Sequence, residues 1–591
     1  MGIQTALSRA RVGTYLSGIV ATALAMGLGA CAPKGFNSAQ IRHSAPRGPQ
    51  DVGVLVENAA AEKVMAFLEQ HPEARVRVLG DGFYEIFGSH RDLVAKEISA
   101  HAQDNSYFRL RTEPHSASAS PFALAWTMAL RSARIPGPAG MRVGNLNPCR
   151  ESPEFPTAKI TVAEPQSDLN ESTVELGQKI RLSTTDSVAD PQFPSSLRKI
   201  LVLAGPGATE ESALMITEEN YEFTPDRLGL YRAILVVQDS RNVCGLEGLQ
   251  FIVTANRPYV GPNFKPIPTL DLDGLHHLAL VSAPQSWDIS EGEGKLLAVV
   301  DTGANYNHPS VAPSIELNQK EIAGNNKDDD ENGLTDDVIG YDFVNNDAFP
   351  YDDDAHGTHV SGLAVGRPFG LARRARLLVV KALTSLGGDI GSISAAIRYA
   401  ADRGAHIINL SVGSPAPFPH PSLIRAIKYA EQKGALIVAA AGNGDPQTGL
   451  GFNIDDIPVY PASLPNENII AVGAYDTENE LSPYSNFGPK GVDVLAPGGF
   501  LPGDPMLSAA FENPENQLLV GMMGTSMATP IVAGIAAQVW SYSPNLSAKE
   551  VRAILMSAGE ALRDPTPVCV SGRHINALSA LELTAKQSVL F

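Results

Sequence analysis

The spacing of apolar residues changes along this chain, and each change indicates a different kind of structure. Between residues 145 and 258, apolar and polar residues alternate with a period of two, and turn residues are frequent. Short alternating strands with this punctuation are typical of a β-sandwich. We predict its strands at residues 159–163, 173–176, 179–183, 199–204, 221–224, 229–239 and 249–254.

From residue 265 to the C-terminus, continuous apolar runs replace this alternation and are separated by helical periodicity. Strands that are apolar throughout are buried on both faces, so this region predicts an α/β fold with a doubly wound parallel sheet. Functional side chains in such sheets gather at the carboxyl ends of strands, where Asp301 and Asn443 are placed. The predicted strands are residues 296–300, 377–382, 405–410, 435–440, 469–474 and 492–495, and helices begin near His356, Ser392, Pro421, Ser526 and Ala548.

Residues 51–115 show a third pattern, a small α+β unit in the order β-α-β-β-α. The last two strands flank Gly80-Asp81-Gly82, which favours a hairpin. The order is ferredoxin-like, and the segments 31–50 and 257–268 predict a tether and a Pro-rich linker. The expected strands are residues 52–56, 75–79 and 83–87, and the expected helices are residues 59–70 and 90–100.

The first 30 residues have the pattern of an export signal. Arg9 and Arg11 precede an uncharged run that is long for a signal and slightly short for a membrane span. The run ends in Leu28-Gly29-Ala30-Cys31, which resembles a bacterial lipobox and implies that Cys31 becomes a lipid-modified N-terminus. An uncleaved N-terminal anchor is the alternative. Both interpretations place the chain outside the cytoplasm on a membrane, and Ala32 favours an outer membrane or the cell surface.

Charge and cysteine content narrow the possible partners. The formal net charge is −19, which argues against a nucleic-acid partner and favours a cation-binding surface. An exported chain lies in an oxidising compartment, where cysteines pair. With Cys31 assigned to lipid, Cys149 and Cys244 bracket the predicted sandwich and are the expected disulfide. Cys569 is left either as a free thiol or in an intermolecular bond.

Three motifs supply the parts of a nucleophilic hydrolase. They are Asp301-Thr302-Gly303, His356-Gly357-Thr358-His359 and Gly524-Thr525-Ser526-Met527-Ala528. A serine hydroxyl needs a base to accept its proton, and the base needs a carboxylate to orient it. In the order Asp, His, Ser, these motifs resemble the subtilisin family of serine endopeptidases. A single Asp-Thr-Gly does not suit an aspartic protease, and no third ligand accompanies His356 and His359 for zinc.

This resemblance implies a subtilisin-like fold and an acyl-enzyme mechanism with Asp301, His356 and Ser526 as the triad. Residues 439–444 resemble the family's oxyanion-hole segment, so Asn443 and the backbone N–H of Ser526 would stabilise the oxyanion. Val459 matches the base of the primary pocket and would disfavour large aromatic residues at the cleaved position. Two segments resemble those that pair with an extended peptide, which implies the substrate-binding residues Leu386, Gly387, Gly388, Ser411, Val412 and Gly413.

The N-terminal regions are interpreted through the same family. The unit at 51–115 resembles the propeptide that precedes many subtilisins, where it assists folding and inhibits the enzyme. Another ferredoxin-like binding module is the alternative. Residues 223–232 resemble the end of an Ig-like or PKD-like domain, whose protein or glycan partner is unknown. A sandwich (residues 145–258) between propeptide and catalytic domain (residues 265–591) departs from the usual layout and leaves the site of propeptide removal open.

An acidic loop at residues 328–337 indicates a metal site. Its oxygen atoms alternate around Gly333, and it resembles the first half of an EF-hand loop without the closing Glu. Similar insertions in some subtilisins bind calcium, and a solvated loop is the alternative. A second run, Asp352-Asp353-Asp354, would either hold the loop of His356 or attract basic substrate residues. The expected ligands of one structural Ca²⁺ are Asp328, Asp330, Asn332, Leu334 and Asp336.

These observations predict an exported, membrane-anchored serine endopeptidase that is made as a zymogen and hydrolyses polypeptides. The alternative is a surface lipoprotein whose sandwich binds a partner and whose subtilisin-like domain is an inactive scaffold. The intact triad residues favour the enzyme.

Overall fold

The computed structural model describes most of the chain after residue 275 and part of the chain before it. These residues form two compact units. The first contains the described residues between residue 110 and Ala255. The second contains the strands before residue 110 together with the residues from Asn256 onward. The expected signal, tether and helix at 90–100 lie outside the described residues. Those residues are 54–57, 64, 67, 75–80, 83–87, 103–104, 158–164, 172–189, 197–205, 214–238, 240, 244–260, 272, 275–385, 387–445, 448–499, 505–511, 518–563 and 567–588.

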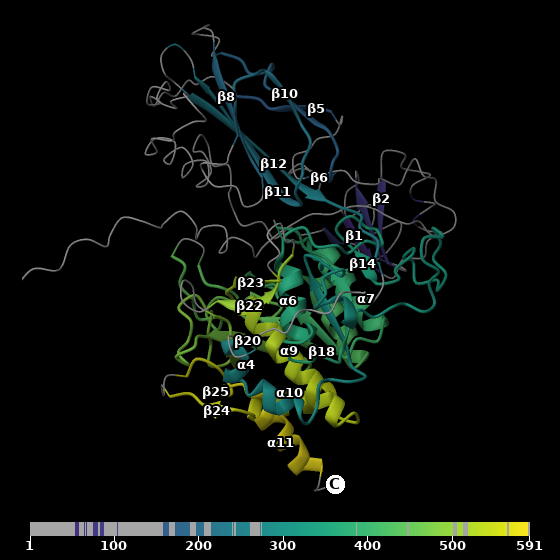
Figure 1. Cartoon of the computed structure of the whole chain (residues 1–591), viewed down its shortest axis with the longest axis vertical. Helices are drawn as coiled ribbons and strands as arrows, with labels where there is room; N and C mark the ends of the chain where they lie inside the picture. The colour runs from purple at the N-terminus through teal and green to yellow at the C-terminus, as the bar shows by residue number, and fades with distance from the viewer. Residues whose placement is uncertain are drawn as a thin grey trace, which may run out of the picture. The chain divides into compact units, whose positions relative to one another are not determined.

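The first unit consists of two β-sheets (Figure 1). The smaller, in the order β10-β7-β5, contains β5 (Thr161–Glu164), β7 (Ile180–Ser183) and β10 (Asn220–Phe223). The larger, in the order β6-β12-β11-β8-β9, contains β6 (Ser172–Glu175), β8 (Arg198–Ala204), β9 (Leu214–Ile216), β11 (Gly229–Gln238) and β12 (Cys244–Thr254). Strands occur at all the predicted positions, although β12 begins at Cys244 rather than Leu249. β9 was not predicted, because a strand of 3 residues is too short to show alternation.

Four N-terminal strands of the second unit form an antiparallel sheet in the order β2-β3-β1-β4. They are β1 (Val54–Glu57), β2 (Arg75–Gly80), β3 (Phe83–Phe87) and β4 (Gln103–Asp104). The hairpin predicted around Gly80-Asp81-Gly82 is confirmed, since β2 pairs with β3. Val64 and Phe67, in the expected first helix, are helical and buried.

A nine-stranded sheet carries the C-terminal part of the chain, in the order β14-β15-β13-β16-β18-β20-β21-β25-β24. Its six longer strands pair in parallel and match the six predicted strands closely. They are β13 (Leu296–Asp301), β15 (Arg376–Lys381), β16 (Ile407–Leu410), β18 (Leu436–Ala440), β20 (Ile469–Tyr475) and β21 (Val494–Pro497). The short strands β14 (Gly340–Asp342), β24 (Glu560–Ala561) and β25 (Arg573–His574) show no periodicity and were not predicted.

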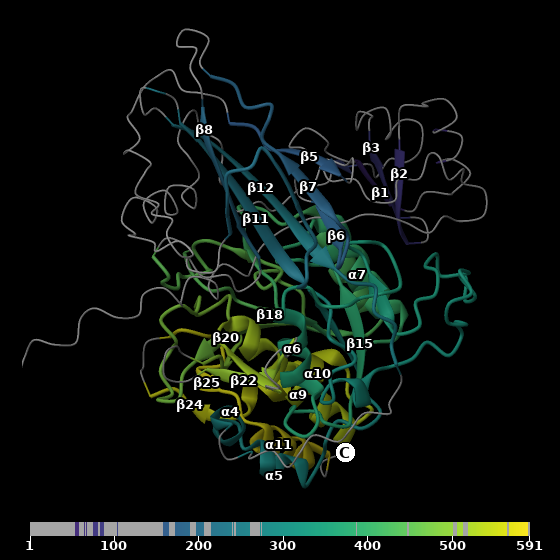
Figure 2. The same cartoon turned by 45° about the horizontal axis from the view of Figure 1, so that its top comes forward.

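Helices cover both faces of this sheet, as the apolar strands predicted (Figure 2). α7 (Ile390–Asp402) and α8 (Pro421–Gln432) pack on one face. The other face is covered by α4 (His276–Leu280), α5 (Ala283–Trp287), α6 (His356–Val365), α9 (Thr525–Tyr542), α10 (Ala548–Ser557) and α11 (Ala577–Ser588).

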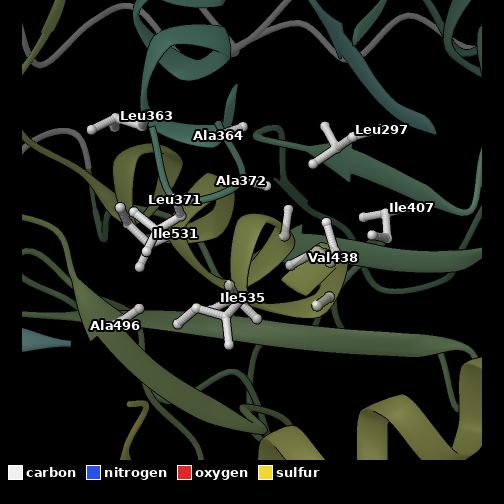
Figure 3. Packing of buried hydrophobic residues seen from close by; sticks show 14 of the residues in the cluster. Leu297, Leu363, Ala364, Leu371, Ala372, Ile407, Val438, Ala496, Ile531 and Ile535 are labelled. Atoms are coloured by element: carbon white, nitrogen blue, oxygen red, sulfur yellow. The ribbon is translucent and has the colours of Figure 1, made fainter. Parts of the chain in front are cut away.

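Residues along one strand alternate between these two cores. Leu297 belongs to the core of α9, whereas the next residue, Ala298, belongs to that of α7 and α8. Figure 3 shows the α9 side, where Ile531 and Ile535 lie among the strand residues Ile407 and Val438. Because the strands are packed on both faces, their carboxyl ends lie together along one edge of the sheet, where the site is built.

Small elements complete this part of the unit. β17 (Ser414–Pro415) pairs with β19 (Val459–Tyr460), β22 (Met506–Ala509) pairs with β23 (Leu519–Met522), and a 3-10 helix, η3, spans Ala312–Ser314. Within the described ranges, no helix has the length and apolar character needed to span a membrane.

Candidate active site

Asp301 and His356 meet at the carboxyl edge of the nine-stranded sheet. Asp301 is the last residue of β13 and is fully buried, and His356 is the first residue of α6. His356 Nδ1 lies 2.7 Å from Asp301 Oδ1, and the backbone N–H of Thr302 donates to the same oxygen at 2.7 Å. A proton on Nδ1 therefore bonds to the carboxylate, which leaves Nε2 as the basic nitrogen.

The buried carboxylate of Asp352 joins the loops that carry these two residues. One of its oxygens accepts hydrogen bonds from Thr302 Oγ1 (2.8 Å) and from the backbone N–H groups of Asp354 (3.0 Å) and Ala355 (3.1 Å). The other accepts from the backbone N–H (2.8 Å) and hydroxyl (2.5 Å) of Thr358. Asp352 thus satisfies N–H groups at the start of α6 and holds the neighbour of Asp301. This is the first of the two roles expected for the run of three aspartates.

Ser526 stands in the first turn of α9 and is 3% exposed. Pro530 has no N–H to donate to the Ser526 carbonyl, and the Ser411 hydroxyl donates to this carbonyl instead (2.8 Å). The Ser526 hydroxyl in turn donates to the Ser411 carbonyl (3.2 Å). The serine is therefore tied to the segment after β16 that the sequence predicted to bind substrate.

The electrostatics at His356 favour its protonated form. Burial lowers the pKa of His356, but Asp301, Asp354 and Asp352 raise it, and the result is about 9. Its Nε2 is buried without a hydrogen-bond partner in the described part of the chain. In this conformation the Ser526 hydroxyl donates to the Ser411 carbonyl and not to His356 Nε2. The hydrogen bond between a nucleophile and its base commonly tightens only when substrate is bound. The three carboxylates thus stabilise the imidazolium that a general base forms.

Asn443, which follows β18, has a fixed amide orientation. Its Oδ1 accepts hydrogen bonds from the backbone N–H (2.8 Å) and hydroxyl (2.9 Å) of Thr525. Because both groups of Thr525 donate, the oxygen must face Thr525 and Nδ2 must face away from it. A Cβ atom at Gly524 would lie 3.2 Å from this Nδ2, so the donor lies beside the turn before Ser526. The Ser526 N–H belongs to the first turn of α9, where it has no carbonyl four residues earlier within the helix to accept its hydrogen bond.

The predicted substrate segments lie near this site. Ser411, Val412 and Gly413 directly follow β16, and β17 then pairs with the strand of Val459. Cβ atoms added at Gly413 and Gly442 would lie 2.8 Å and 3.6 Å from Val459 Cγ1. Two glycines therefore face one buried, branched side chain. In the second segment, Gly387 forms a β-bridge with Thr384 in the turn after β15, with Gly388 next to it, whereas Leu386 lies outside the described residues.

The acidic loop is shaped by its own side chains. Asp328 accepts the backbone N–H groups of Asn332 (3.1 Å) and Gly333 (2.8 Å). Asp336 accepts those of Asn325 (3.1 Å) and Asn326 (2.9 Å). The N–H of Leu334 donates to Asn332 Oδ1 (2.8 Å). These bonds close tight turns, and the carboxylates of Asp328 and Asp336 do not join Asp330 in a cluster within the described part of the chain.

Asp330 instead meets Glu321 and Asp337, with one oxygen of each within 4.8 Å of the others. Glu321 Oε2 and Asp330 Oδ1 are buried and have no hydrogen-bond partner among the described residues. Burial and the charges of Asp337 and Asp330 raise the pKa of Glu321. Such an oxygen cluster with unsatisfied atoms fits a calcium ion. The sequence pattern missed Glu321 and Asp337 because both lie outside its alternating positions.

The cysteine predictions are tested little by this structure. Cys31 and Cys149 lie outside the described residues, and Cys244 is described only as the first residue of β12. Cys569 is buried and unpaired within the described ranges, with Sγ 3.6 Å from Ser571 Oγ. His359 is fully buried on α6, and its Nε2 lies 2.9 Å from the Met506 carbonyl, as expected for a packed helix residue.

Known proteins resemble the C-terminal part of this chain. The model of the Subtilase family matches residues 292–572. Thermitase of Thermoactinomyces vulgaris is 33% identical over 309 residues, which cover 51% of this chain and 94% of thermitase. A thermophilic serine proteinase of Bacillus sp. (strain AK1) is 35% identical over 328 residues, which cover 52% and 71% of the two chains. A solved cold adapted subtilisin-like serine proteinase is 26% identical and covers 49% of this chain and 88% of its own, with a TM-score of 0.38. On the sequence match to thermitase, this chain belongs to the subtilase family of serine endopeptidases.

Proposed function

We propose that this protein is an exported, membrane-anchored serine endopeptidase, made as a zymogen, that uses Asp301, His356 and Ser526 as its catalytic triad. The observation that carries the proposal is the 2.7 Å contact between His356 Nδ1 and Asp301 Oδ1. It orients the base and leaves Nε2 of the same ring available for a proton. Ser526 at a helix N-terminus and Asn443 beside it supply a nucleophile and an oxyanion donor.

The reaction proceeds by acyl transfer. His356 Nε2 takes the proton of Ser526 Oγ, which forms a bond to the carbonyl carbon of the substrate. The C–N bond then breaks, the imidazolium gives its proton to the leaving amine, and an ester on Ser526 remains. The same imidazole deprotonates a water molecule that hydrolyses the ester and restores the hydroxyl. In both steps Asp301, with Asp354 and Asp352 nearby, stabilises the imidazolium.

Asn443 Nδ2 and the backbone N–H of Ser526 form the oxyanion hole. Support comes from Thr525, whose two hydrogen bonds to Asn443 Oδ1 hold the amide in one orientation. A donor that is held in place before the reaction does not have to reorganise when the oxyanion forms.

The substrate is an extended polypeptide that pairs with the backbone of residues 411–413 and 386–388. Val459 sets its selectivity. The side chain is 1% exposed and lies against the positions of Gly413 and Gly442, where larger residues would collide with it or with its neighbours. A branched side chain at the base of the pocket shortens it, so small and medium side chains are preferred at the cleaved position.

One structural calcium ion binds the acidic loop. Glu321, Asp330 and Asp337 would hold it, because their oxygens converge and two of them have no protein partner in the described part of the chain. The ion would supply no chemistry to the reaction. It would neutralise Glu321 and Asp330, since Asp337 is already paired with Arg403 (2.9 Å). It would also stabilise the fold of the loop, which Asp328 and Asp336 already close by accepting backbone N–H groups.

Residues 51–115 are an inhibitory propeptide. The sheet order β2-β3-β1-β4 supports this, because it is the order of a ferredoxin-like β-α-β-β-α-β unit, the architecture that the family resemblance implied. The grouping of these strands in the same compact unit as the catalytic residues is further support.

The propeptide is removed by a cut before Arg257. The residues that follow are bound to the catalytic region: Arg257 Nη1 donates to Tyr351 Oη (3.1 Å), with the guanidinium 5.0 Å from the ring centre. Tyr259 Oη donates to the Ala312 carbonyl (3.2 Å), and the Val260 N–H donates to Asn307 Oδ1 (3.1 Å). A backbone segment held in this way is a poor substrate, because proteolysis favours exposed segments with few contacts.

The first unit is an Ig-like or PKD-like sandwich that binds a protein or glycan partner, and Cys31 anchors the uncleaved chain to a bacterial membrane, at the outer membrane or cell surface. Support for the sandwich comes from Tyr231, whose ring centre lies 5.5 Å from that of Phe251. Burial raises the pKa of Tyr231, while hydrogen bonds with the backbone of Arg227 and Asp226 act to lower it. A tyrosine bonded to the preceding corner is a feature of such domains. The disulfide Cys149–Cys244 belongs to the same unit.

The test is intact mass and N-terminal sequencing of protein expressed from Ala32, beside Ser526→Ala and a serine-directed phosphonate probe. We expect clipping and labelling of the Ser526 protein alone, with a new N-terminus upstream of Arg257. If protein freed of the propeptide folds but does not react with the probe, the inactive-scaffold alternative is correct.

A further inference from the structure

Lys381 is a fully buried cation at the end of β15, the strand that lies beside β13. It is the register partner of Asp301. Its Nζ donates to the carbonyls of Thr302 (2.8 Å) and Leu383 (3.1 Å) and forms an ion pair with Asp353 Oδ1 (3.0 Å). Burial of an ammonium group is costly unless oxygens surround it, and these three oxygens do so.

Two of these contacts lie in the loops that carry the catalytic pair. Thr302 follows Asp301, and its N–H, hydroxyl and carbonyl are bound to Asp301, Asp352 and Lys381, in that order. Asp353 belongs to the loop that leads into His356, and its side chain is 1% exposed. Lys381 Nζ is therefore a bridge between the peptide after Asp301 and the loop before His356.

Charge balance alone does not account for a lysine at this position. Burial lowers the pKa of Lys381, but Asp353, Asp342 and Asp352 raise it above its usual value, so the ammonium stays protonated among several carboxylates. A buried ion pair can often be replaced by apolar side chains of similar volume without loss of stability. An apolar pair would leave the Thr302 carbonyl without its N–H donor.

We propose that Lys381 is a positioning residue for the catalytic pair: by holding the Thr302 carbonyl and Asp353 it sets the alignment of the Asp301 carboxylate with His356 Nδ1. This inference rests on the triad proposed above. Lys381 touches neither the substrate nor the reacting atoms and acts through Asp301 and His356.

The experiment compares wild type, Asp353→Asn, Lys381→Met/Asp353→Asn and Lys381→Gln/Asp353→Asn, each expressed from Ala32. The double variants remove one charge of each sign and leave the net charge unchanged near the acid limb expected at pH 9, because burial raises the pKa of Asp353 only to about 7. Rates are measured per active site titrated with the phosphonate probe, over a range of pH. Arg552→Met/Asp493→Asn is the control, since this ion pair (2.5 Å) is partly buried and joins α10 to residues near β21, away from the triad.

We expect the Met variant to lose about 10-fold or more in kcat with little change in KM, because small misplacements of a catalytic group are costly. The Gln variant, which keeps an N–H donor, should recover part of this loss. The acid limb of the pH profile should also move. Weaker alignment with Asp301 lowers the pKa of His356 and shifts the limb to lower pH, whereas loss of a positive charge alone would shift it to higher pH. Asp301, Asp354 and Asp352, which act on His356, are unchanged in every variant.

Equal kcat and an unchanged acid limb in the folded double variants and in Asp353→Asn would overturn the proposal. If the Met variant does not fold, the Gln variant decides in the same way, by its kcat and acid limb relative to Asp353→Asn. Failure of wild type to react with the phosphonate would contradict the triad itself, and that outcome is distinct from any difference among the variants. A similar loss of kcat in the control would show a general effect of lost ion pairs and would also refute positioning.

Discussion

Substitution of Asn443 by Ala or by Asp tests the roles of its amide oxygen and amide nitrogen separately. Oδ1 accepts two hydrogen bonds from Thr525, at 2.8 Å and 2.9 Å, while Nδ2 faces away from Thr525. Asn443→Ala removes both ends. Asn443→Asp keeps an acceptor for Thr525 and replaces the Nδ2 donor with a carboxylate oxygen. The two variants should therefore share a catalytic defect and differ in stability.

The size of each effect follows from these contacts. Loss of one oxyanion donor in a subtilisin lowers kcat by about 10²–10³, or roughly 2.7–4 kcal/mol. KM should change little, because the donor acts on the oxyanion more than on the bound substrate. Asn443→Asp should lose at least as much, since its negative oxygen faces the oxyanion. Asn443→Ala also leaves two Thr525 donors without their acceptor, which lowers the free energy of unfolding by about 1–3 kcal/mol at 0.5–1.5 kcal/mol per bond.

Initial rates on a chromogenic peptide give kcat and KM, and thermal melts of phosphonate-labelled protein give stability without self-digestion. Asn466→Ala is the control, because its Nδ2 donates to Glu431 Oε2 (3.0 Å) before the amino end of β20, at the opposite edge of the sheet. We expect it to keep wild-type kcat. A kcat within about fivefold of wild type in both Asn443 variants would refute an oxyanion role for this side chain.

Three further predictions test the charges, the metal and the pocket. Asp354→Asn removes a negative charge that raises the pKa of His356, so the acid limb of kcat/KM, expected near pH 9 in wild type, should move to lower pH; a limb that stays in place contradicts this electrostatic account. The pKa of Asp354, raised to about 7 by burial and by Asp352, leaves it ionised at that limb. Calcium at 100 times its Kd should stabilise the fold by about 2.7 kcal/mol. Glu321→Gln should reduce the difference in melting temperature with and without chelator, whereas the exposed control Glu478→Gln should not. Melting temperatures that do not respond to chelator would count against the site. Val459→Ala should raise kcat/KM for Phe over Leu at the cleaved position by about 10-fold, measured with a peptide library; a wild-type preference for Phe or Tyr would show that Val459 does not limit the pocket.

The apolar pattern predicted much of the fold because burial is repeated locally along each strand and helix. The six continuous apolar runs became the six longer parallel strands, and helices α6 and α8 begin at His356 and Pro421 as expected. Strands of two or three residues, such as β14 and β24, were missed because they are too short to show a period. The order Asp, His, Ser and the strand end at Asp301 were enough to place Asp301 and His356 at the carboxyl edge.

The sequence by itself thus determined the fold class, the family and the candidate catalytic residues, because periodicity and short motifs are local properties. Only the tertiary structure decided which distant groups support them. Asp352 binds Thr302 across 50 positions, and Ser411 binds the Ser526 carbonyl across 115 positions. Glu321 and Asp337 join Asp330, and Lys381 is buried beside Asp301. A buried polar group needs a partner, but any of many polar residues can satisfy it, and the packing of the sheet edge selects which one lies within reach.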